Sequence, residues 1–352
     1  MKAALVLKDG TVLEGLGFGE KCSQIGELVF STAMTGYEES LTDPSYAGQI
    51  LVSTYPLIGN YGISGRRRES DQIHVNGFAI RQLSPQQEHR DSTGTLDQFM
   101  KEFAKPGIYG IDTRYIVRHI RDKGVMPAIL TTYDEKIDTK KMLEQLEFDY
   151  SSVDFVSKVT TKTQKVFNKG GKKKVVLMDF GAKMGMIKEL TSRNIEVHLL
   201  PSFSTSEDVK SIEPDGIMLS NGPGDPAILK DAHKLIRSLE GYRPIFGVCL
   251  GNQLIAHAFG SDTYKLKFGH RGCNHAVLDV KRNRIHLTTQ NHGFAVRAAP
   301  KGFEVTHINV NDQTIEGIAN YNKQIFSVQY HPEATPGPND SRYLFDEFVK
   351  MM

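Results

Sequence analysis

The sequence predicts an α/β protein with a doubly wound, mostly parallel sheet in its C-terminal half and a mixed α/β domain in its N-terminal half. From residue 173 onward, short apolar runs alternate with helical segments, which is the pattern of a parallel sheet with helices on its faces. The first part of the chain opens instead with short strands and turns. The segment between the two parts is polar and irregular, as inter-domain connections are.

These changes in pattern set the domain boundaries. We expect an N-terminal domain over residues 1–150, a linker over residues 151–172 and a second domain over residues 173–352. The length of 352 residues is sufficient for two domains that each bury a core. In the first domain, the glycine-rich residues 15–19 are expected to form a flexible hairpin, since their spacing is not that of a dinucleotide-binding loop.

The second domain begins with a continuous apolar run at residues 175–178, as in a strand that is buried on both faces. The later strands are predicted at residues 197–200, 216–220, 245–248 and 325–330, and the helices at residues 182–193, 227–239, 250–259 and 340–349. A further short helix is expected with Ser206 as its N-cap. After Gly260 the pattern changes to short strands separated by turns.

Composition excludes several classes of function. The chain has 43 basic and 41 acidic residues, a net charge of +2, which gives no electrostatic case for binding nucleic acid or an anionic membrane surface. No apolar stretch approaches the roughly 20 residues of a membrane span. The three cysteines are odd in number and irregular in spacing, and no signal peptide precedes them. We therefore expect a reduced, cytoplasmic protein.

Cys249 is the candidate nucleophile. It follows a predicted strand, begins a predicted helix and is flanked by Gly247 and Gly251, which is the cysteine form of a nucleophile elbow. The helix N-terminus favours thiolate over thiol, and the N–H of Leu250 points to where an oxyanion would form. From these flanks alone, a packed strand-end cysteine is as good an interpretation as a nucleophile.

A base and its partner follow another buried strand. His331 and Glu333 come at its end with Pro332 between them, and residues i and i+2 of an extended chain face the same side. A histidine with a carboxylate behind it is the usual general base for a thiol. The loop at residues 221–226 follows a third strand, and the N–H of Gly222 can complete an oxyanion hole there.

These motifs together resemble class I glutamine amidotransferases of the triad type, whose sheet is flavodoxin-like. Residues 179–183, 219–226, 290–294 and 331–334 narrow the resemblance to the small-chain family of carbamoyl-phosphate synthetase. The N-terminal half is similar to the extra domain that is specific to that family, through residues 33–39, 41–46, 55–60 and 110–114.

The resemblance implies roles for individual residues. Cys249 is the nucleophile, His331 the base and Glu333 its orienter. The residues implied to bind glutamine come from both domains, and they are Ser45, Gly222, Gly224, Leu250, Gln253, Asn291, Gly293 and Phe294. The sequence departs from the family pattern at Asn252, where many members have histidine, and at Arg271 and Cys273.

The resemblance also implies a partner and cofactors on it. A large subunit would bind ATP and magnesium and make carbamoyl phosphate for arginine or pyrimidine synthesis, the choice between which stays open. Ammonia would reach it through a tunnel. This chain has no P-loop, and we expect no cofactor in it. The spacing of His270, His275, His286 and His292 fits no compact ligand set, so no metal is expected either.

Three rival interpretations remain. The first is the amidotransferase subunit of another synthetase, such as those of anthranilate, GMP or aminodeoxychorismate synthesis. Residues 1–150 argue against it, because such subunits have no need of this domain. A non-catalytic partner would usually lose one of Cys249, His331 and Glu333, and all three are present. A peptidase or other cysteine hydrolase is disfavoured by Gln253 and by the loop at residues 291–294, which suit glutamine.

Overall fold

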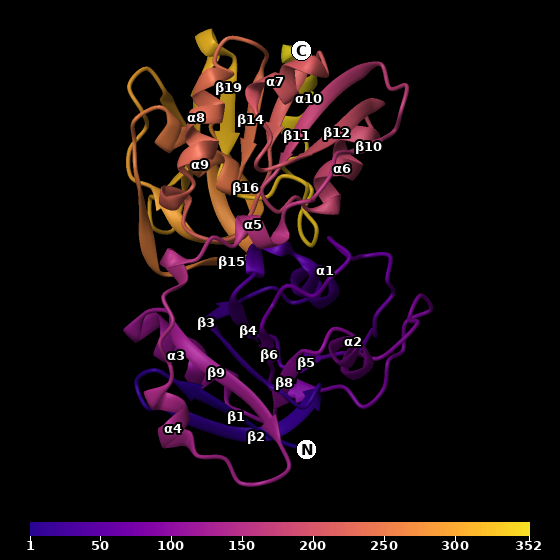
Figure 1. Cartoon of the computed structure of the whole chain (residues 1–352), viewed down its shortest axis with the longest axis vertical. Coiled ribbons are helices and arrows are strands. Elements are labelled where there is room, and N and C mark those ends of the chain that lie inside the picture. The colour runs from indigo at the N-terminus through magenta and orange to yellow at the C-terminus, as the bar shows by residue number, and fades with distance from the viewer. The chain divides into compact units, whose positions relative to one another are not determined.

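The computed structural model describes residues 1–352, which divide into two units, Met1–Ser151 and Ser152–Met352 (Figure 1). Each unit contains its own sheet and its own buried apolar clusters. None of the helices combines the length and the apolar character that crossing a membrane requires.

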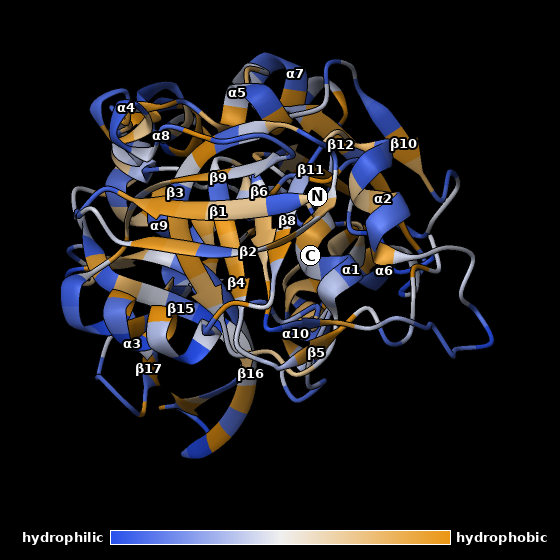
Figure 2. Ribbon diagram, turned by 90° about the horizontal axis from the view of Figure 1, so that it is seen from below, coloured by the Kyte–Doolittle hydropathy of each residue, from blue (hydrophilic) through white to orange (hydrophobic).

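The N-terminal unit is built around a closed barrel with the strand order β1-β2-β8-β6-β4-β3-β9. The strands of the barrel are β1 (Lys2–Leu7), β2 (Val12–Gly19), β3 (Ser23–Ser31), β4 (Gln49–Ser53), β6 (Gly77–Ala79), β8 (Pro106–Tyr109) and β9 (Met126–Tyr133). The helices are α1 (Tyr37–Thr42), α2 (Leu96–Glu102), α3 (Thr113–Lys123) and α4 (Thr139–Glu144). Strand β1 is buried from its second residue onward, and most of its length is coloured as hydrophobic in Figure 2. The unit is therefore mixed α/β, as expected.

The glycine-rich residues 15–19 are not a flexible hairpin, which corrects the sequence-based expectation. They lie inside β2 and pair with both β1 and β8. A Cβ on Gly15 would lie 2.5 Å from the carbonyl oxygen of Tyr109, and one on Gly17 would lie 3.0 Å from that of Lys2. The glycines are required because neighbouring backbone approaches closely, which is a common reason for glycine within a strand.

The C-terminal unit contains one ten-stranded sheet with the order β10-β12-β11-β13-β14-β19-β18-β16-β15-β17. Its parallel part is β12 (Ile195–Pro201), β11 (Lys173–Asp179), β13 (Gly216–Leu219), β14 (Ile245–Val248) and β19 (Ile325–Val328). The remaining strands pair antiparallel, and they are β10 (Lys165–Phe167), β15 (Thr263–Asp279), β16 (Arg284–Val296), β17 (Glu304–Asn309) and β18 (Ile315–Asn320). The parallel strands are those predicted from the apolar runs.

Helices cover both faces of the parallel strands (Figure 1). They are α6 (Met184–Thr191), α7 (Ser206–Ser211), α8 (Lys230–Ser238), α9 (Leu250–Ala258) and α10 (Tyr343–Met351). Successive residues of β11 enter opposite cores: Val176 packs in the cluster with α8 and α9, and Val175 in the cluster with α6 and α10. This alternation explains the continuous apolar run, since both faces of the strand are buried.

Three details differ from the expectations. The strands after Gly260 are long, with 17 residues in β15 and 13 in β16, and register shifts interrupt their pairing. The segment 151–172 carries the helix α5 (Val156–Val159) and the edge strand β10, which pairs with β12 and so needs little apolar periodicity of its own. The N-cap of α7 is Thr205, because its hydroxyl accepts the N–H of Asp208 and the Asp208 carboxylate accepts that of Thr205.

Candidate active site

Cys249 lies in a sharp turn between β14 and α9. Its φ of 55° and ψ of −104° are rare for a residue with a side chain, and such strain is often found at functional sites. A Cβ on Gly247 would lie 2.8 Å from the backbone of Gly251, and one on Gly251 would lie 2.4 Å from the Leu219 carbonyl oxygen. The geometry of a nucleophile elbow is therefore present, and the two glycines permit it.

His331 and Glu333 are paired beside this turn. The Nδ1 of His331 lies 2.7 Å from Oε1 of Glu333, and both residues are 2 % exposed. The backbone N–H of His331 donates to the Thr289 carbonyl on β16, which fixes the segment after β19. The Nε2 of His331 has no hydrogen-bond partner within the protein. It is consequently available for proton transfer.

Sequence patterns assign no role to Lys183, which lies just after β11 at the N-cap of α6. Its side chain is 2 % exposed, and Nζ donates to Oε1 of Glu333 at 2.9 Å and to the Thr335 carbonyl at 2.6 Å. The feature that marks Lys183 as functional is its ion pair with a buried carboxylate. This pair forms only on folding, because 150 residues separate Lys183 from Glu333.

The ionisation states of His331 and Glu333 depend on each other and on Lys183. Burial alone would raise the pKa of Glu333, but Lys183 and His331 hold it far below its usual range. Burial alone would lower the pKa of His331, but the Glu333 carboxylate and the Cys249 side chain raise it well above 6.5. An ionised Glu333 therefore keeps a proton on His331, which places an imidazolium beside Cys249.

The glycine loop after β13 lies against the start of α9. A Cβ on Gly222 would lie 2.2 Å from the Phe180 carbonyl oxygen and 2.7 Å from the Leu250 side chain. Gly224 has a φ of 93°, which few other residues adopt. The N–H groups of the first turn of a helix have no partner within the helix, so that of Leu250 is a donor suited to an oxyanion.

Strand β16 brings the other candidate glutamine-binding residues to Cys249. The thiol of Cys249 lies 3.7 Å from the carbonyl oxygen of Asn291, and Nε2 of Gln253 donates to the carbonyl of Phe294 at 2.8 Å. Gly293 lies between these two residues of β16. Ser45 belongs to the N-terminal unit, where it is buried in a 3-10 helix (Pro44–Tyr46) and its N–H donates to Oδ1 of Asp43.

All three departures from the family pattern have local partners. Nη1 of Arg271 donates to the carbonyl of Phe268 at 2.9 Å, and the thiol of Cys273 lies 3.4 Å from the carbonyl oxygen of Pro336. Asn252 is fully buried in the first turn of α9.

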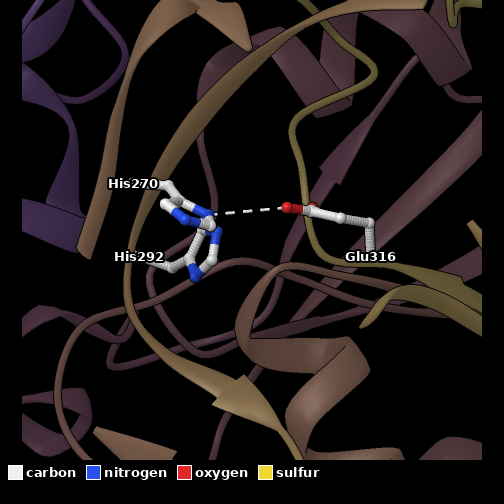
Figure 3. Close-up of side chains that lie close together, drawn as sticks. All are labelled: His270, His292 and Glu316. Carbon is white, nitrogen blue, oxygen red and sulfur yellow. Dashed lines mark ion pairs between the residues drawn. The ribbon is translucent and has the colours of Figure 1, made fainter. Parts of the chain in front are cut away.

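Three residues that are far apart in sequence form a compact buried group on strands β15, β16 and β18 (Figure 3). Nitrogen and carboxylate atoms of His270, His292 and Glu316 lie within 4.8 Å of one another, so the spacing argument missed a group that three strands assemble. Both ring nitrogens of His292 are already within hydrogen-bonding distance of neighbours, the Phe294 carbonyl at 2.8 Å and the Gln290 side chain at 2.5 Å. The group thereby supports residues 291–294, which lie within β16 and do not form the loop expected from the sequence.

His270 lies within ion-pair distance of two carboxylates. Its Nδ1 lies 3.5 Å from the Glu316 carboxylate, and its Nε2 lies 2.8 Å from that of Asp312. Burial alone would lower the pKa of His270, but these two carboxylates raise it. The contacts are those of a buried ion pair between strands.

Comparison with known proteins identifies the families that the two parts of the chain match. Residues 176–351 match the family model of class-I glutamine amidotransferases, and residues 5–130 match that of the carbamoyl-phosphate synthase small chain, CPSase domain. The elbow, the histidine and the carboxylate thus lie in a class-I glutamine amidotransferase domain.

Curated relatives extend over the whole chain. The carbamoyl phosphate synthase small chain of Methanocaldococcus jannaschii is 48 % identical, and the match covers 100 % of this chain and 99 % of that one. Those of Archaeoglobus fulgidus and Clostridium acetobutylicum are 46 % and 44 % identical, with 100 % of this chain and 99 % and 100 % of theirs covered. The chain belongs to the carbamoyl phosphate synthase small-chain family.

Proposed function

We propose that this chain is the glutaminase subunit of a carbamoyl-phosphate synthase, and that Cys249 attacks the side-chain carboxamide of L-glutamine. The observation that carries the proposal is the fully buried His331–Glu333 pair, 2.7 Å apart, next to the strained turn of Cys249. A thiol, a histidine and an orienting carboxylate are the minimum set for thioester chemistry.

The site supports the following sequence of events. The Cys249 thiolate adds to the carboxamide carbon, and the N–H groups of Gly222 and Leu250 bind the resulting oxyanion. His331 gives its proton to the departing ammonia, which leaves a γ-glutamyl thioester. It then takes a proton from water, and hydrolysis releases glutamate and restores Cys249.

The other residues are proposed to hold the substrate. Gln253 and Asn291 offer amide groups to the zwitterionic end of glutamine. Gly293 allows the backbone to approach, and Phe294 supplies an apolar wall. Gly224 belongs to the same loop as Gly222, and Ser45 is proposed as a contact from the N-terminal unit.

The ammonia is proposed to serve a second active site. The family name and the N-terminal domain support a large-subunit partner that binds ATP and magnesium and makes carbamoyl phosphate from bicarbonate, with the ammonia passing through a tunnel. On this proposal the chain itself needs no cofactor. The product would enter arginine synthesis, pyrimidine synthesis or both.

The test uses the chain with and without a co-purified large subunit. We expect glutamate release from glutamine by the parent protein, and glutamine-dependent carbamoyl phosphate only with the large subunit. In the Cys249→Ala variant, both should vanish while free ammonia still supports synthesis by the complex. Glutamate release by that variant would remove Cys249 from the proposed role, and synthesis of another aminated product would favour a different synthetase.

A further inference from the structure

We propose that Gln329 is a further residue of the reaction centre, which holds the sulfur of Cys249 as a thiolate through an amide N–H oriented by Asn252 and Gln253. The inference rests on the proposed role of Cys249 and deepens it. Neither the family resemblance nor the sequence motifs assign a function to Gln329 or Asn252.

The backbone places Gln329 beside the nucleophile. Val248 and Val328 are register partners in the parallel strands β14 and β19, so Cys249 and Gln329 each follow the last residue of a strand. The backbone N–H of Gln329 donates to the carbonyl of Glu316 at 2.8 Å, which anchors this position to β18. Its side chain is fully buried, and Nε2 lies 3.7 Å from the Cys249 sulfur.

Two donors fix the orientation of the Gln329 amide. Its Oε1 accepts hydrogen bonds from Nδ2 of Asn252 at 3.2 Å and from Nε2 of Gln253 at 3.1 Å. Rotating the amide by half a turn would bring its NH₂ against two other NH₂ groups and would lose both bonds in a buried place. The N–H group therefore faces the sulfur.

The two donors are themselves held. The Oδ1 of Asn252 accepts the Ser327 hydroxyl at 2.9 Å, and Nε2 of Gln253 also donates to the Phe294 carbonyl at 2.8 Å. Ser327, Gln329 and His331 are alternate residues of one segment, and all three act on the site. This gives Asn252 a function: it orients Gln329.

The chemistry follows from the needs of a buried sulfur anion. A thiolate accepts hydrogen bonds far better than a thiol, and donors to an ionised group form the stronger hydrogen bonds. The charged groups on the other side are His331 with Glu333 and Lys183 behind it, and that imidazolium supplies one interaction. Gln329 supplies a second interaction. Because its amide carries no net charge, this interaction persists when His331 loses its proton during the reaction.

The experiment measures the thiolate directly in the full-length chain. The rate of iodoacetamide alkylation of Cys249 is followed by peptide mass spectrometry from about pH 5 to 10, a range that brackets the reference pKa of free thiols. In Gln329→Met, which keeps the length and loses the N–H, the pH of half-maximal rate should rise by about one unit. The limiting rate at high pH should increase about threefold, because a thiolate relieved of a hydrogen bond is a stronger nucleophile.

Two further variants complete the design. Asn252→Leu removes one of the two donors to Gln329 without adding a charge and should move the half-maximal pH in the same direction by a smaller amount. Gln49→Met is the matched control, since Gln49 is a glutamine of the N-terminal unit that is also buried, with 2 % exposure and a Glu27 partner. Its alkylation profile should equal that of the parent.

An unchanged half-maximal pH in Gln329→Met, or a rate lowered by the same factor at every pH, would overturn the proposal. If that variant does not fold, Asn252→Leu decides: a profile identical to the parent overturns it. The readout needs neither glutamine nor a large subunit. Failure of the proposed function would appear instead as absent glutamate release by the parent complex, which the alkylation profile does not affect.

Discussion

Lys183 and Glu333 form a fully buried ion pair, with 2.9 Å between Nζ and Oε1, and the same carboxylate oxygen also accepts Nδ1 of His331. One carboxylate thus pairs with two cations in a place that is almost inaccessible to water. A buried carboxylate with fewer partners would take up a proton, and the order of charges behind Cys249 would be lost.

Removing Lys183 should show how much the buried carboxylate of Glu333 depends on this partner. In Lys183→Met we expect the free energy of unfolding to fall by about 2–3 kcal/mol, at or below the usual cost of breaking a buried pair, because His331 still compensates Glu333. Urea denaturation at pH 7 measures this. Lys188, on the same helix α6 but exposed, is the control for loss of a lysine. A loss no greater than that of Lys188→Met would contradict the account.

Stability should depend on pH through the same group. The pKa of Glu333 is lowered on folding, so its contribution is present above the usual value of 4.5 and is lost as the pH falls through the lowered pKa. The pKa of His331 is raised, so its contribution is full below 6.5 and is lost as the pH rises through the raised pKa. The difference in unfolding free energy between the parent and His331→Gln should therefore shrink steadily as the pH is raised above 6.5.

The oxyanion loop offers a steric test. In Gly222→Ala the new methyl group would meet the Phe180 carbonyl at 2.2 Å, so the loop must move and its N–H must leave the oxyanion position. We expect kcat for glutaminase to drop about 10²–10³-fold. Gly94→Ala is the control, because Gly94, like Gly222, does not have a positive φ, but a Cβ there would meet nothing closer than the Gln98 side chain at 3.5 Å. Equal activity losses in the two variants would contradict a specific role of the Gly222 N–H.

Alkylation of Gln329→Met and glutamate release by Cys249→Ala test the two proposals directly. The first separates an electrostatic role of Gln329 from a packing role, because only the electrostatic role raises both the half-maximal pH and the limiting rate. The second separates glutamine hydrolysis from ammonia-dependent synthesis in the same complex.

The sequence was sufficient for the parts of the fold that repeat a simple pattern. The parallel strands were visible because both faces are buried, and the elbow was visible because Gly247 and Gly251 are forced by close backbone contacts. The residues at 15–19 were misread for a related reason: glycine spacing alone does not distinguish a free hairpin from a strand under close contact.

The remaining site residues could not be found in this way, because their significance lies in contacts between distant segments. Lys183 acts through its ion pair with Glu333, and Asn252 acts through its hydrogen bond to Gln329. Likewise, His270 and His292 are cross-strand partners that meet Glu316 only through the order of β15, β16 and β18 in the sheet. Sequence spacing contains none of these relationships.

The register between β14 and β19 has a consequence for how this chain can change. Ser327, Gln329, His331 and Glu333 project from alternate positions of one segment, and Val248 opposite Val328 sets where that segment meets Cys249. Gaining or losing one residue within 325–333 would displace the side chains on one side of the change relative to those on the other, so the four could no longer meet at the site. Substitutions in this segment can have small or large effects, whereas a change of length always displaces side chains of the site. Natural insertions and deletions should therefore avoid this segment, while surface turns accept them.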